Sequence, residues 1–347
     1  MRGLVYHGPG DVRCERVADP VLSAAHGALV RVTAASICGS DLHLLHGRVP
    51  VEPGFVVGHE FVGVVEEPGA DVTRLRRGDR VLASGLVGCG VCPPCRAGEA
   101  TTCTTHPLIR VFGVSRELHG GQAERVYVPF ADFNLFAIPP QLHDEDVLFL
   151  TDILPTGYQG ALYGAVAPGE VVAVVGGGPV GLCAAIGARL LGAERVIVSD
   201  PVPARRTAAI RLGVEAASPD EAPGRVLDAT DGRGADVAIE AVGRADSLTA
   251  AVELARVGGR VSVLGVFVEP DLPFPMGLVF LKELTLRTGL ANIPRHVPVL
   301  LPHVASGRLR PRDLVTHRLA LSEGAEAYRL FDERRDGCLK VLLDPTR

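Results

Sequence analysis

The sequence contains no run of basic residues, and this absence argues against a nucleic-acid partner. Its 35 lysines and arginines are outnumbered by 40 aspartates and glutamates, which gives a formal net charge of −5 at neutral pH. A domain that holds a phosphate backbone needs basic residues concentrated on one face or along one helix. We therefore expect no nucleic-acid partner.

A long unbroken apolar segment is also missing. The uncharged stretch Val171–Ala188 carries four glycines and a proline between positions 176 and 181. Because a membrane-spanning helix needs about 20 consecutive apolar residues, this stretch favours a buried strand, a turn and the start of a helix. The segment Met1–Tyr6 lacks the features of a secretory signal. We therefore expect a cytoplasmic protein that does not bind to a membrane.

Hydrophobic residues make up 47% of the sequence and charged residues 22%, as in an ordinary soluble enzyme. The length of 347 residues suggests two domains. Up to about residue 150, short strand-like segments such as Leu29–Ala34 and Glu60–Val65 are separated by glycine and proline. This first part is expected to be rich in β-structure.

After about residue 153, apolar strand patterns alternate with helical ones. The expected strands are Val171–Val175, Arg195–Ser199, Asp236–Glu240 and Arg260–Leu264, and the expected helices are Pro179–Leu191, Pro203–Leu212 and Ser247–Arg256. Strands that are apolar throughout are covered on both faces, as happens in parallel sheets. The pattern predicts an α/β fold with a doubly wound parallel sheet.

A glycine-rich turn follows the first of these strands and opens a helix. Its residues fit the pattern G-x-G-x-x-G, and the positions expected to receive a dinucleotide are Gly176, Gly178, Pro179, Val180 and Gly181. Glycines there allow a tight turn and a close approach of the pyrophosphate to the helix N-terminus.

Asp200 ends the next strand, where a carboxylate can accept hydrogen bonds from the adenosine ribose. A carboxylate repels a 2′-phosphate, so Asp200 favours NAD over NADP. Arg205 lies close by in the sequence and could hold that phosphate, which leaves NADP open as the less favoured cofactor.

Four of the eight cysteines, Cys89, Cys92, Cys95 and Cys103, lie within one short segment. Four thiolates with no exchangeable position describe a closed, structural zinc site. The alternative is a pair of disulfides or a set of inert thiols, which an intracellular setting disfavours.

A second set of metal ligands is dispersed along the chain. Cys38 and His59 could belong to an open zinc site with three protein ligands and one exchangeable position. Taken alone, each would more often be a buried thiol or a core histidine. The third ligand must come from elsewhere in the chain.

Together these segments resemble the zinc-dependent medium-chain alcohol dehydrogenases over the whole chain. The matching segments are Cys38–His43, Gly58–Glu60, the four-cysteine segment, Asp152–Tyr158, the glycine turn with Asp200, and Gly337–Lys340. The resemblance implies zinc-dependent hydride transfer between a primary or secondary alcohol and NAD(P), which gives an aldehyde or ketone.

The resemblance also implies a division of the chain into two domains. Residues 1–153 and 291–347 are expected to form a GroES-like, β-rich catalytic domain, with the structural zinc lobe at about 85–105. Residues 154–290 are expected to form a Rossmann domain.

The resemblance assigns Cys38 and His59 as ligands of a catalytic zinc ion. Many members place a cysteine as third ligand where this chain has Asp152, and a branch of the family similarly uses aspartate there. With the four-cysteine site, this predicts two zinc ions per chain. A carboxylate is a harder ligand than a thiolate.

Further roles are implied for five residues. Ser40 is similar to the hydroxyl that contacts the substrate oxygen, and His43 to the solvent end of a proton relay, although it could also be a plain turn histidine. Glu60 is similar to a carboxylate behind the zinc that approaches it during ligand exchange, or that only supports the site. Thr156 is similar to a residue behind the nicotinamide, and Lys340 to a basic contact of the pyrophosphate.

Three other functions share parts of this pattern. One is a dismutase, similar to formaldehyde dehydrogenases, that keeps its nicotinamide bound; another is a redox-silent NAD-binding regulatory protein. A zinc-free quinone reductase shares the fold but lacks both ligand sets. The family resemblance also predicts a homo-oligomer, a tetramer more than a dimer, with Leu284–Arg287 as a sheet-edge strand that pairs between copies. The sequence does not indicate which alcohol is the substrate.

Overall fold

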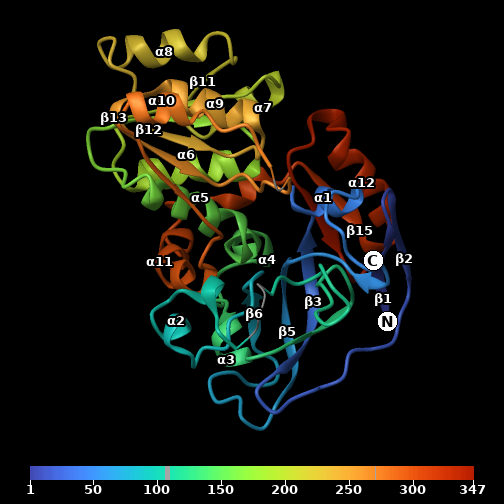
Figure 1. Cartoon of the computed structure of the whole chain (residues 1–347). Helices are drawn as coiled ribbons and strands as arrows, with labels where there is room; N and C mark the ends of the chain where they lie inside the picture. Colours follow the sequence, from blue (N-terminus) through green and yellow to red (C-terminus); the bar gives the residue numbers. More distant parts are fainter. Residues whose placement is uncertain (106–109, 270) are drawn as a thin grey trace. The chain divides into compact units, whose positions relative to one another are not determined.

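The computed structural model describes residues 1–105, 110–269 and 271–347. The chain forms two compact units (Figure 1). The first unit consists of Met1–Asp152 and Asn292–Arg347, and the second of Ile153–Ala291. The first unit is therefore built from two separate parts of the sequence.

The first unit is mainly β-structure. Its strands are β1 (Arg2–Gly8), β2 (Asp11–Arg16), β3 (Ala28–Ser36), β4 (Phe55–Val56), β5 (Glu60–Pro68), β6 (Arg80–Ala83), β7 (Arg125–Val128), β8 (Leu135–Ala137), β15 (His317–Ala320) and β16 (Val341–Asp344). Its α-helices are α1 (Asp41–Leu45), α2 (Pro93–Arg96), α3 (Ala131–Asn134), α4 (Asp144–Val147), α11 (Ile293–Ala305) and α12 (Gly324–Asp332). Its 3-10 helices are η1 (Ala100–Thr102), η2 (Leu148–Thr151), η3 (Pro311–Leu314), η4 (Leu321–Glu323) and η5 (Arg335–Gly337).

These strands form two sheets. The smaller has the order β2-β1-β4, and the larger has the order β15-β16-β3-β5-β6-β8, with β7 also paired to β3. The C-terminal strand β16 runs antiparallel to β3, with Leu342 opposite Ser36. Apolar residues of both sheets and of α12 pack in one buried cluster. This packing explains how the last part of the chain joins a domain begun by the first part.

The second unit has the expected alternation of strands and helices. Its strands are β9 (Val171–Val175), β10 (Arg195–Ser199), β11 (Glu215–Ala217), β12 (Ala235–Glu240), β13 (Ala255–Val263) and β14 (Thr285–Thr288). Its helices are α5 (Ile153–Tyr163), α6 (Pro179–Leu190), α7 (Pro203–Arg211), α8 (Ala222–Asp228), α9 (Ala245–Leu254) and α10 (Met276–Leu281).

All neighbouring strands of this unit pair in parallel, in the order β11-β10-β9-β12-β13-β14. Numbered within the unit, this is the 3-2-1-4-5-6 order of the Rossmann fold, whose ligand site lies beyond the carboxyl ends of the strands at the reversal of order. That reversal falls between β9 and β12. The expected fold class, a GroES-like β-rich domain with a Rossmann domain, is confirmed.

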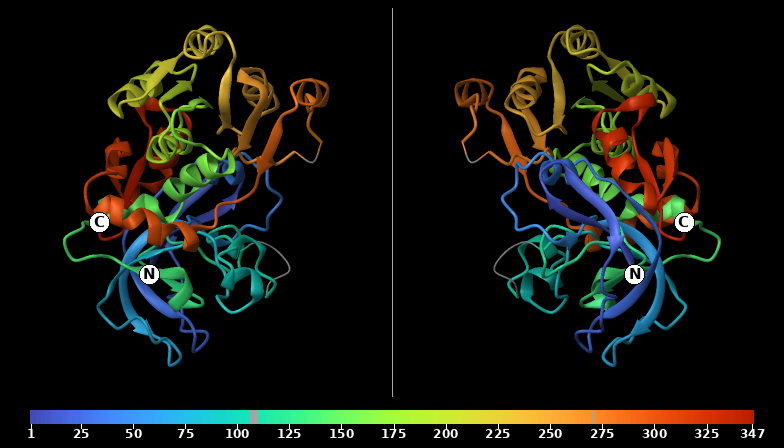
Figure 2. Two further views of the ribbon diagram at one scale, coloured as in Figure 1. Left: turned by 90° about the vertical axis from the view of Figure 1, so that its left-hand side faces the viewer. Right: turned by 90° about the vertical axis from the view of Figure 1, so that its right-hand side faces the viewer.

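Helices cover both faces of the parallel sheet (Figure 2). Val171, Ala173 and Val175 share a buried cluster with residues of α8, α9 and α10. Side chains alternate between the faces of a strand, so Val172 and Val174 point to the other face, where α6 contacts β9. Complete burial of β9 explains its uninterrupted apolar sequence.

The uncharged stretch Val171–Ala188 consists of β9, the glycine turn and the first part of α6. Among the described residues, none of the helices combines the length and the apolar character that a membrane crossing requires. The reading of this stretch as strand, turn and helix is therefore confirmed.

Candidate metal centres and cofactor site

The four clustered cysteines converge within the first unit. Their sulfur atoms all lie within 4.8 Å of one another, and the pairs Cys89–Cys95 and Cys92–Cys103 are each separated by 3.9 Å. Around a tetrahedral zinc ion, thiolate sulfurs lie about 3.8 Å apart, whereas a disulfide joins them at about 2.0 Å. All four thiols are free. The arrangement therefore fits a closed metal site and does not support the disulfide alternative.

Local backbone structure holds these cysteines in place. Cys92 precedes α2, where Pro93 takes the first helical position, and its amide donates to the Cys89 sulfur at 3.4 Å. A hydrogen bond from the Cys95 backbone lowers the pKa of Cys92 to about 6. One face of the cluster packs against Phe133. The backbone thus supports a thiolate at Cys92, whereas burial raises the pKa of Cys95 to about 12.

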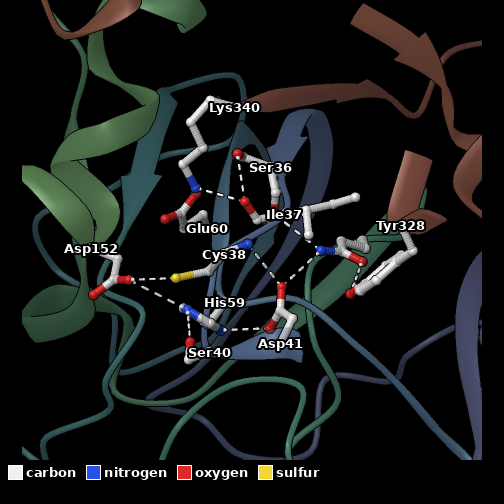
Figure 3. A network of polar contacts seen from close by, with 11 residues as sticks. Ser36, Ile37, Cys38, Ser40, Asp41, His59, Glu60, Asp152, Tyr328 and Lys340 are labelled. Atoms are coloured by element: carbon white, nitrogen blue, oxygen red, sulfur yellow. Dashed lines mark hydrogen bonds and ion pairs between the residues drawn. The ribbon is translucent and has the colours of Figure 1, made fainter. Parts of the chain in front are cut away.

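The dispersed ligand residues also meet within the first unit, as Figure 3 shows. Cys38 follows β3 and His59 precedes β5, and the pairing of Ser36 with Glu60 in these antiparallel strands brings the two ligands together. Asp152 directly follows η2. Its Oδ2 atom lies 3.4 Å from the Cys38 sulfur and 3.4 Å from His59 Nε2.

These separations match a tetrahedral set of mixed ligands, whose neighbouring atoms lie about 3.3 to 3.5 Å apart. Cys38 and His59 are buried, and the Asp152 side chain is 18% exposed. Ligand atoms of Cys38, His59, Glu60 and Asp152 all lie within 4.8 Å of one another. The residues therefore fit a zinc ion bound by Cys38, His59 and Asp152, with Glu60 as a neighbour.

Asp41 is a further part of this site that sequence reasoning missed. Its Oδ1 atom faces His59 Nδ1 at 3.2 Å, and its Oδ2 atom accepts from the Cys38 backbone amide at 3.0 Å. A carboxylate on the far nitrogen of a metal-binding histidine fixes the ring and its tautomer. Burial lowers the pKa of His59, but the charges of Asp41 and Cys38 raise it well above its usual value. In the sequence, the only indication of this role was that Asp41 lies three residues after the ligand Cys38.

Glu60 and Lys340 form a fully buried ion pair. The Lys340 ammonium donates to Glu60 Oε2 and, at 2.7 Å, to the Ile37 carbonyl. Burial lowers the pKa of Lys340, but the Glu60 charge raises it above its usual value. The expected contact between Lys340 and a pyrophosphate is thus replaced here by a contact with a carboxylate, because the ammonium has no exposed surface to offer.

The two relay candidates lie on the segment that follows Cys38. Ser40 Oγ is 3.4 Å from His59 Nε2, so the hydroxyl lies beside the ligand atoms. His43 is half-buried on α1, one turn beyond Ser40. The geometry places Ser40 in the site, and the relay role of His43 stays a prediction.

The glycine turn in the second unit has the expected geometry. Gly176 has φ of +102°, a left-handed conformation that favours glycine, and Gly178 caps α6 with Pro179 in the first helical position. A Cβ atom on Gly181 would lie 1.8 Å from the Gly176 carbonyl oxygen. Gly181 therefore allows α6 to pack directly against the turn.

Asp200 directly follows β10 and is buried. Its carboxylate accepts from the Gly177 amide at 2.7 Å and from the Val202 amide at 2.8 Å, and Arg205 Nη1 lies 3.4 Å away. Asp200 thus fixes the glycine turn as well as standing where a ribose would be expected. Sequence reasoning anticipated the second role only. Thr156 lies half-buried on α5 in the same unit.

Sequence reasoning also missed Glu240, the last residue of β12. It is opposite Val175 at the end of β9, so it lies at the reversal of strand order. Its Oε1 atom accepts from the amides of Val242 and Gly243 and from the Ser247 hydroxyl. Burial raises the pKa of Glu240. The carboxylate holds the loop after β12, and no motif in the sequence indicated this.

Comparison with known proteins places the chain in a family. Residues 24–140 match the alcohol dehydrogenase GroES-like domain, and residues 179–305 match the zinc-binding dehydrogenase domain. The chain belongs to the zinc-dependent medium-chain alcohol dehydrogenases. It is an enzyme of this class, a zinc-dependent NAD(P)-linked oxidoreductase.

Individual relatives span nearly the whole chain. A Mycobacterium tuberculosis protein named as a probable zinc-binding alcohol dehydrogenase is 40% identical over 99% of this chain and 89% of its own length. The structure of an alcohol dehydrogenase from Thermus sp. ATN1 is 42% identical, covers 99% of both chains and has a TM-score of 0.92. A glutathione-independent formaldehyde dehydrogenase of Pseudomonas aeruginosa is 34% identical over 95% of this chain and 94% of its own. The family prediction is confirmed.

Proposed function

We propose that this alcohol dehydrogenase oxidises a primary or secondary alcohol to an aldehyde or ketone with NAD as the hydride acceptor. A catalytic zinc ion would be held by Cys38, His59 and Asp152, and a structural one by the four-cysteine cluster. The observation that carries the proposal is the convergence of three unlike ligand atoms in one buried site. Three protein ligands leave one coordination position for a substrate oxygen, as in catalytic zinc sites.

The side chains around this position suit proton removal from an alcohol. When bound, zinc supplies a Lewis acid for the substrate oxygen and NAD supplies the acceptor for the hydride. The Ser40 hydroxyl lies close enough to the ligand set to accept the substrate proton. His43, on the same short segment, would pass that proton to solvent. Asp41 holds the His59 ring in the orientation that presents Nε2 to the metal.

NAD is preferred over NADP because of Asp200. Its buried carboxylate lies next to Gly177 in the glycine turn and would repel a 2′-phosphate. The nearby Arg205 already faces this carboxylate, so the charge of Arg205 is partly balanced by Asp200 before any cofactor binds. The pairing reduces the capacity of Arg205 to attract a phosphate and supports NAD.

Two alternatives predict different behaviour. A dismutase similar to formaldehyde dehydrogenases would convert two aldehyde molecules and one water molecule into an alcohol and a carboxylic acid without added NAD. The Pseudomonas aeruginosa relative makes this the stronger alternative. A redox-silent NAD-binding regulatory protein would bind the cofactor without turnover. The retention of Cys38, His59 and Asp152 in one site argues against the second alternative.

The test is a panel of primary and secondary alcohols, aldehydes and ketones, followed by nicotinamide absorbance with NAD and with NADP. We expect turnover that requires added NAD and is lost in Cys38→Ser. Product formation from aldehydes without added cofactor would support the dismutase. Absence of turnover across the panel, with normal NAD binding, would contradict the proposed enzyme activity.

We also propose that the chain forms a homotetramer in which the second units pair through β14. This strand is at the edge of the parallel sheet. The preceding segment exposes several large apolar side chains, namely Phe274, Met276, Phe280 and Leu281. Apolar surface next to an open strand edge is typical of an interface between copies.

A further inference from the structure

We propose that Lys340 is a positioning residue that holds Glu60 away from the catalytic metal and so keeps the fourth coordination position open. The inference rests on the proposed function, because it concerns the same metal site. It assigns Lys340 a role that differs from cofactor binding. Its basis is the buried geometry around Glu60.

Glu60 is itself within reach of the metal site. One of its carboxylate oxygens lies within 4.8 Å of ligand atoms of Cys38, His59 and Asp152. Its Oε1 atom is buried and, among the described residues, has no hydrogen-bond partner. Because a buried carboxylate oxygen without a partner is costly, Glu60 would gain by coordinating a cation placed next to it.

Lys340 engages the other oxygen and contacts each segment that carries a ligand. Its ammonium donates to Glu60 Oε2 and to the carbonyl of Ile37, the residue before Cys38. It also lies 5.2 Å from the ring centre of Phe149 in η2, the helix that leads to Asp152. Thr316 fixes the backbone of Lys340 through its hydroxyl and amide. The ammonium is therefore held firmly in place.

The charges of the site balance in two pairs. The Cys38 thiolate and the Asp152 carboxylate neutralise a divalent zinc ion, and Lys340 neutralises Glu60. Both members of the second pair are fully buried. Removal of the lysine charge would leave the Glu60 charge uncompensated in the interior, which is strongly unfavourable. The nearest cation would then be the metal, and Glu60 would move onto its open position.

The experiment uses full-length protein loaded with Co²⁺, and imidazole as a probe for an open coordination position. The four-cysteine site is closed, so only the catalytic site should change its visible spectrum when imidazole is added. In Lys340→Met we expect an altered Co²⁺ spectrum before imidazole is added. The dissociation constant of imidazole should rise by at least about tenfold, because Glu60 competes for the same position.

Three variants serve as controls. Glu60→Gln/Lys340→Met should bind imidazole within about threefold of the wild type, because the competing carboxylate is gone. Glu60→Gln alone should behave in the same way. Lys340→Arg should keep the wild-type spectrum, because the charge is retained. If Lys340→Met does not fold, Lys340→Gln carries the same test with a donor left for the Ile37 carbonyl.

The outcomes separate the inference from the proposed function. Wild-type spectrum and imidazole affinity in Lys340→Met would overturn the inference and leave the zinc enzyme intact. Failure of Lys340→Met and Lys340→Gln to fold, with a folded Glu60→Gln/Lys340→Met variant, would make the pair purely structural and also overturn the inference. A wild-type protein whose Co²⁺ spectrum does not respond to imidazole would contradict the open metal site itself.

Discussion

At the scale of single residues, Asp152 decides the character of the catalytic metal site. Asp152→Asn keeps the size of the side chain but removes the charge that helps to balance a divalent ion. We expect weaker zinc binding and a loss of turnover of at least about 100-fold, with NAD affinity little changed. Zinc content by elemental analysis and steady-state rates would measure these effects.

The outcome of this substitution also tests the ligand assignment. Asp152→Cys should retain zinc, since a thiolate is a softer ligand of the same charge. If Asp152 only ended η2 and preceded α5, asparagine would serve as well. Normal zinc content and turnover in Asp152→Asn would therefore rule out Asp152 as a ligand, and Glu60 would become the third ligand to test.

Residue patterns in the sequence predicted the metal ligands well, but they did not predict which side chains contact the residues around the ligands. Cys38, His59 and Asp152 were recognisable because of the short motifs around them, and the structure brings them together. The pairing of Lys340 with Glu60 could not be predicted, because it joins residues 280 positions apart in the sequence. The inward contacts of Asp200 depend on the conformation of a turn, which a motif does not specify.

At the scale of elements, two glycines of the glycine turn have different roles: Gly181 is needed for close packing, and Gly178 for the approach of the cofactor. A Cβ atom at Gly181 would overlap the Gly176 carbonyl, whereas one at Gly178 would meet Arg205 at 3.8 Å, an ordinary contact. We expect Gly181→Ala to lower the free energy of unfolding by about 1 to 3 kcal/mol and to weaken NAD binding. Gly178→Ala should keep the stability but bind NAD more weakly, because the methyl group hinders the pyrophosphate.

Denaturant unfolding and calorimetric titration with NAD would measure the two effects. Wild-type stability in Gly181→Ala would show that α6 can move away from the turn without cost. That result would contradict the role assigned to close packing at this helix start.

The four-cysteine lobe is an element whose stability depends on metal. We expect Cys89→Ser to remove one zinc ion per chain and to lower the melting temperature by on the order of 10 °C, because the metal's binding energy contributes to folding. Cys38→Ser should instead abolish turnover with a smaller thermal effect. Cys14→Ser changes a half-buried thiol outside both clusters. It is a control that should leave the zinc content, the melting temperature and the turnover unchanged. Two zinc ions retained in Cys89→Ser would contradict the structural site.

The sequence pattern located the regular elements of the second unit and missed the irregular ones. Strands β9 and β10 have the expected bounds, because β9 is apolar throughout and β10 is apolar between Arg195 and Ser199. The helix expected up to Arg256 ends at Leu254, and β13 begins at Ala255 instead of Arg260. The register of β13 against β12 is irregular before Arg260, and the sequence pattern did not indicate this early part of the strand. The elements β11, α8 and α10 have only three, seven and six residues, which is too short for a periodic pattern to reveal them.

At the scale of the whole molecule, the exposed apolar residues near β14 predict self-association. Phe280 and Leu281 are each 75% exposed. We expect light scattering at micromolar concentration to give the mass of a tetramer, and Phe280→Asp with Leu281→Asp to reduce it. Val21→Asp, at a 71% exposed position in the first unit, is a matched control that should leave the mass unchanged. A monomeric wild type would exclude the proposed assembly.

Because the first unit is built from two separate parts of the sequence, the two units can fold in a particular order during synthesis. Until Val341–Asp344 emerges from the ribosome, the β3 edge that later pairs with β16 has no partner. The second unit is continuous in sequence and is synthesised in full before that point. It can therefore fold first, because domains fold as units during synthesis. Lys340 is translated after Cys38, His59 and Glu60, so a metal ion that reaches Cys38 and His59 before then would meet Glu60 without its lysine.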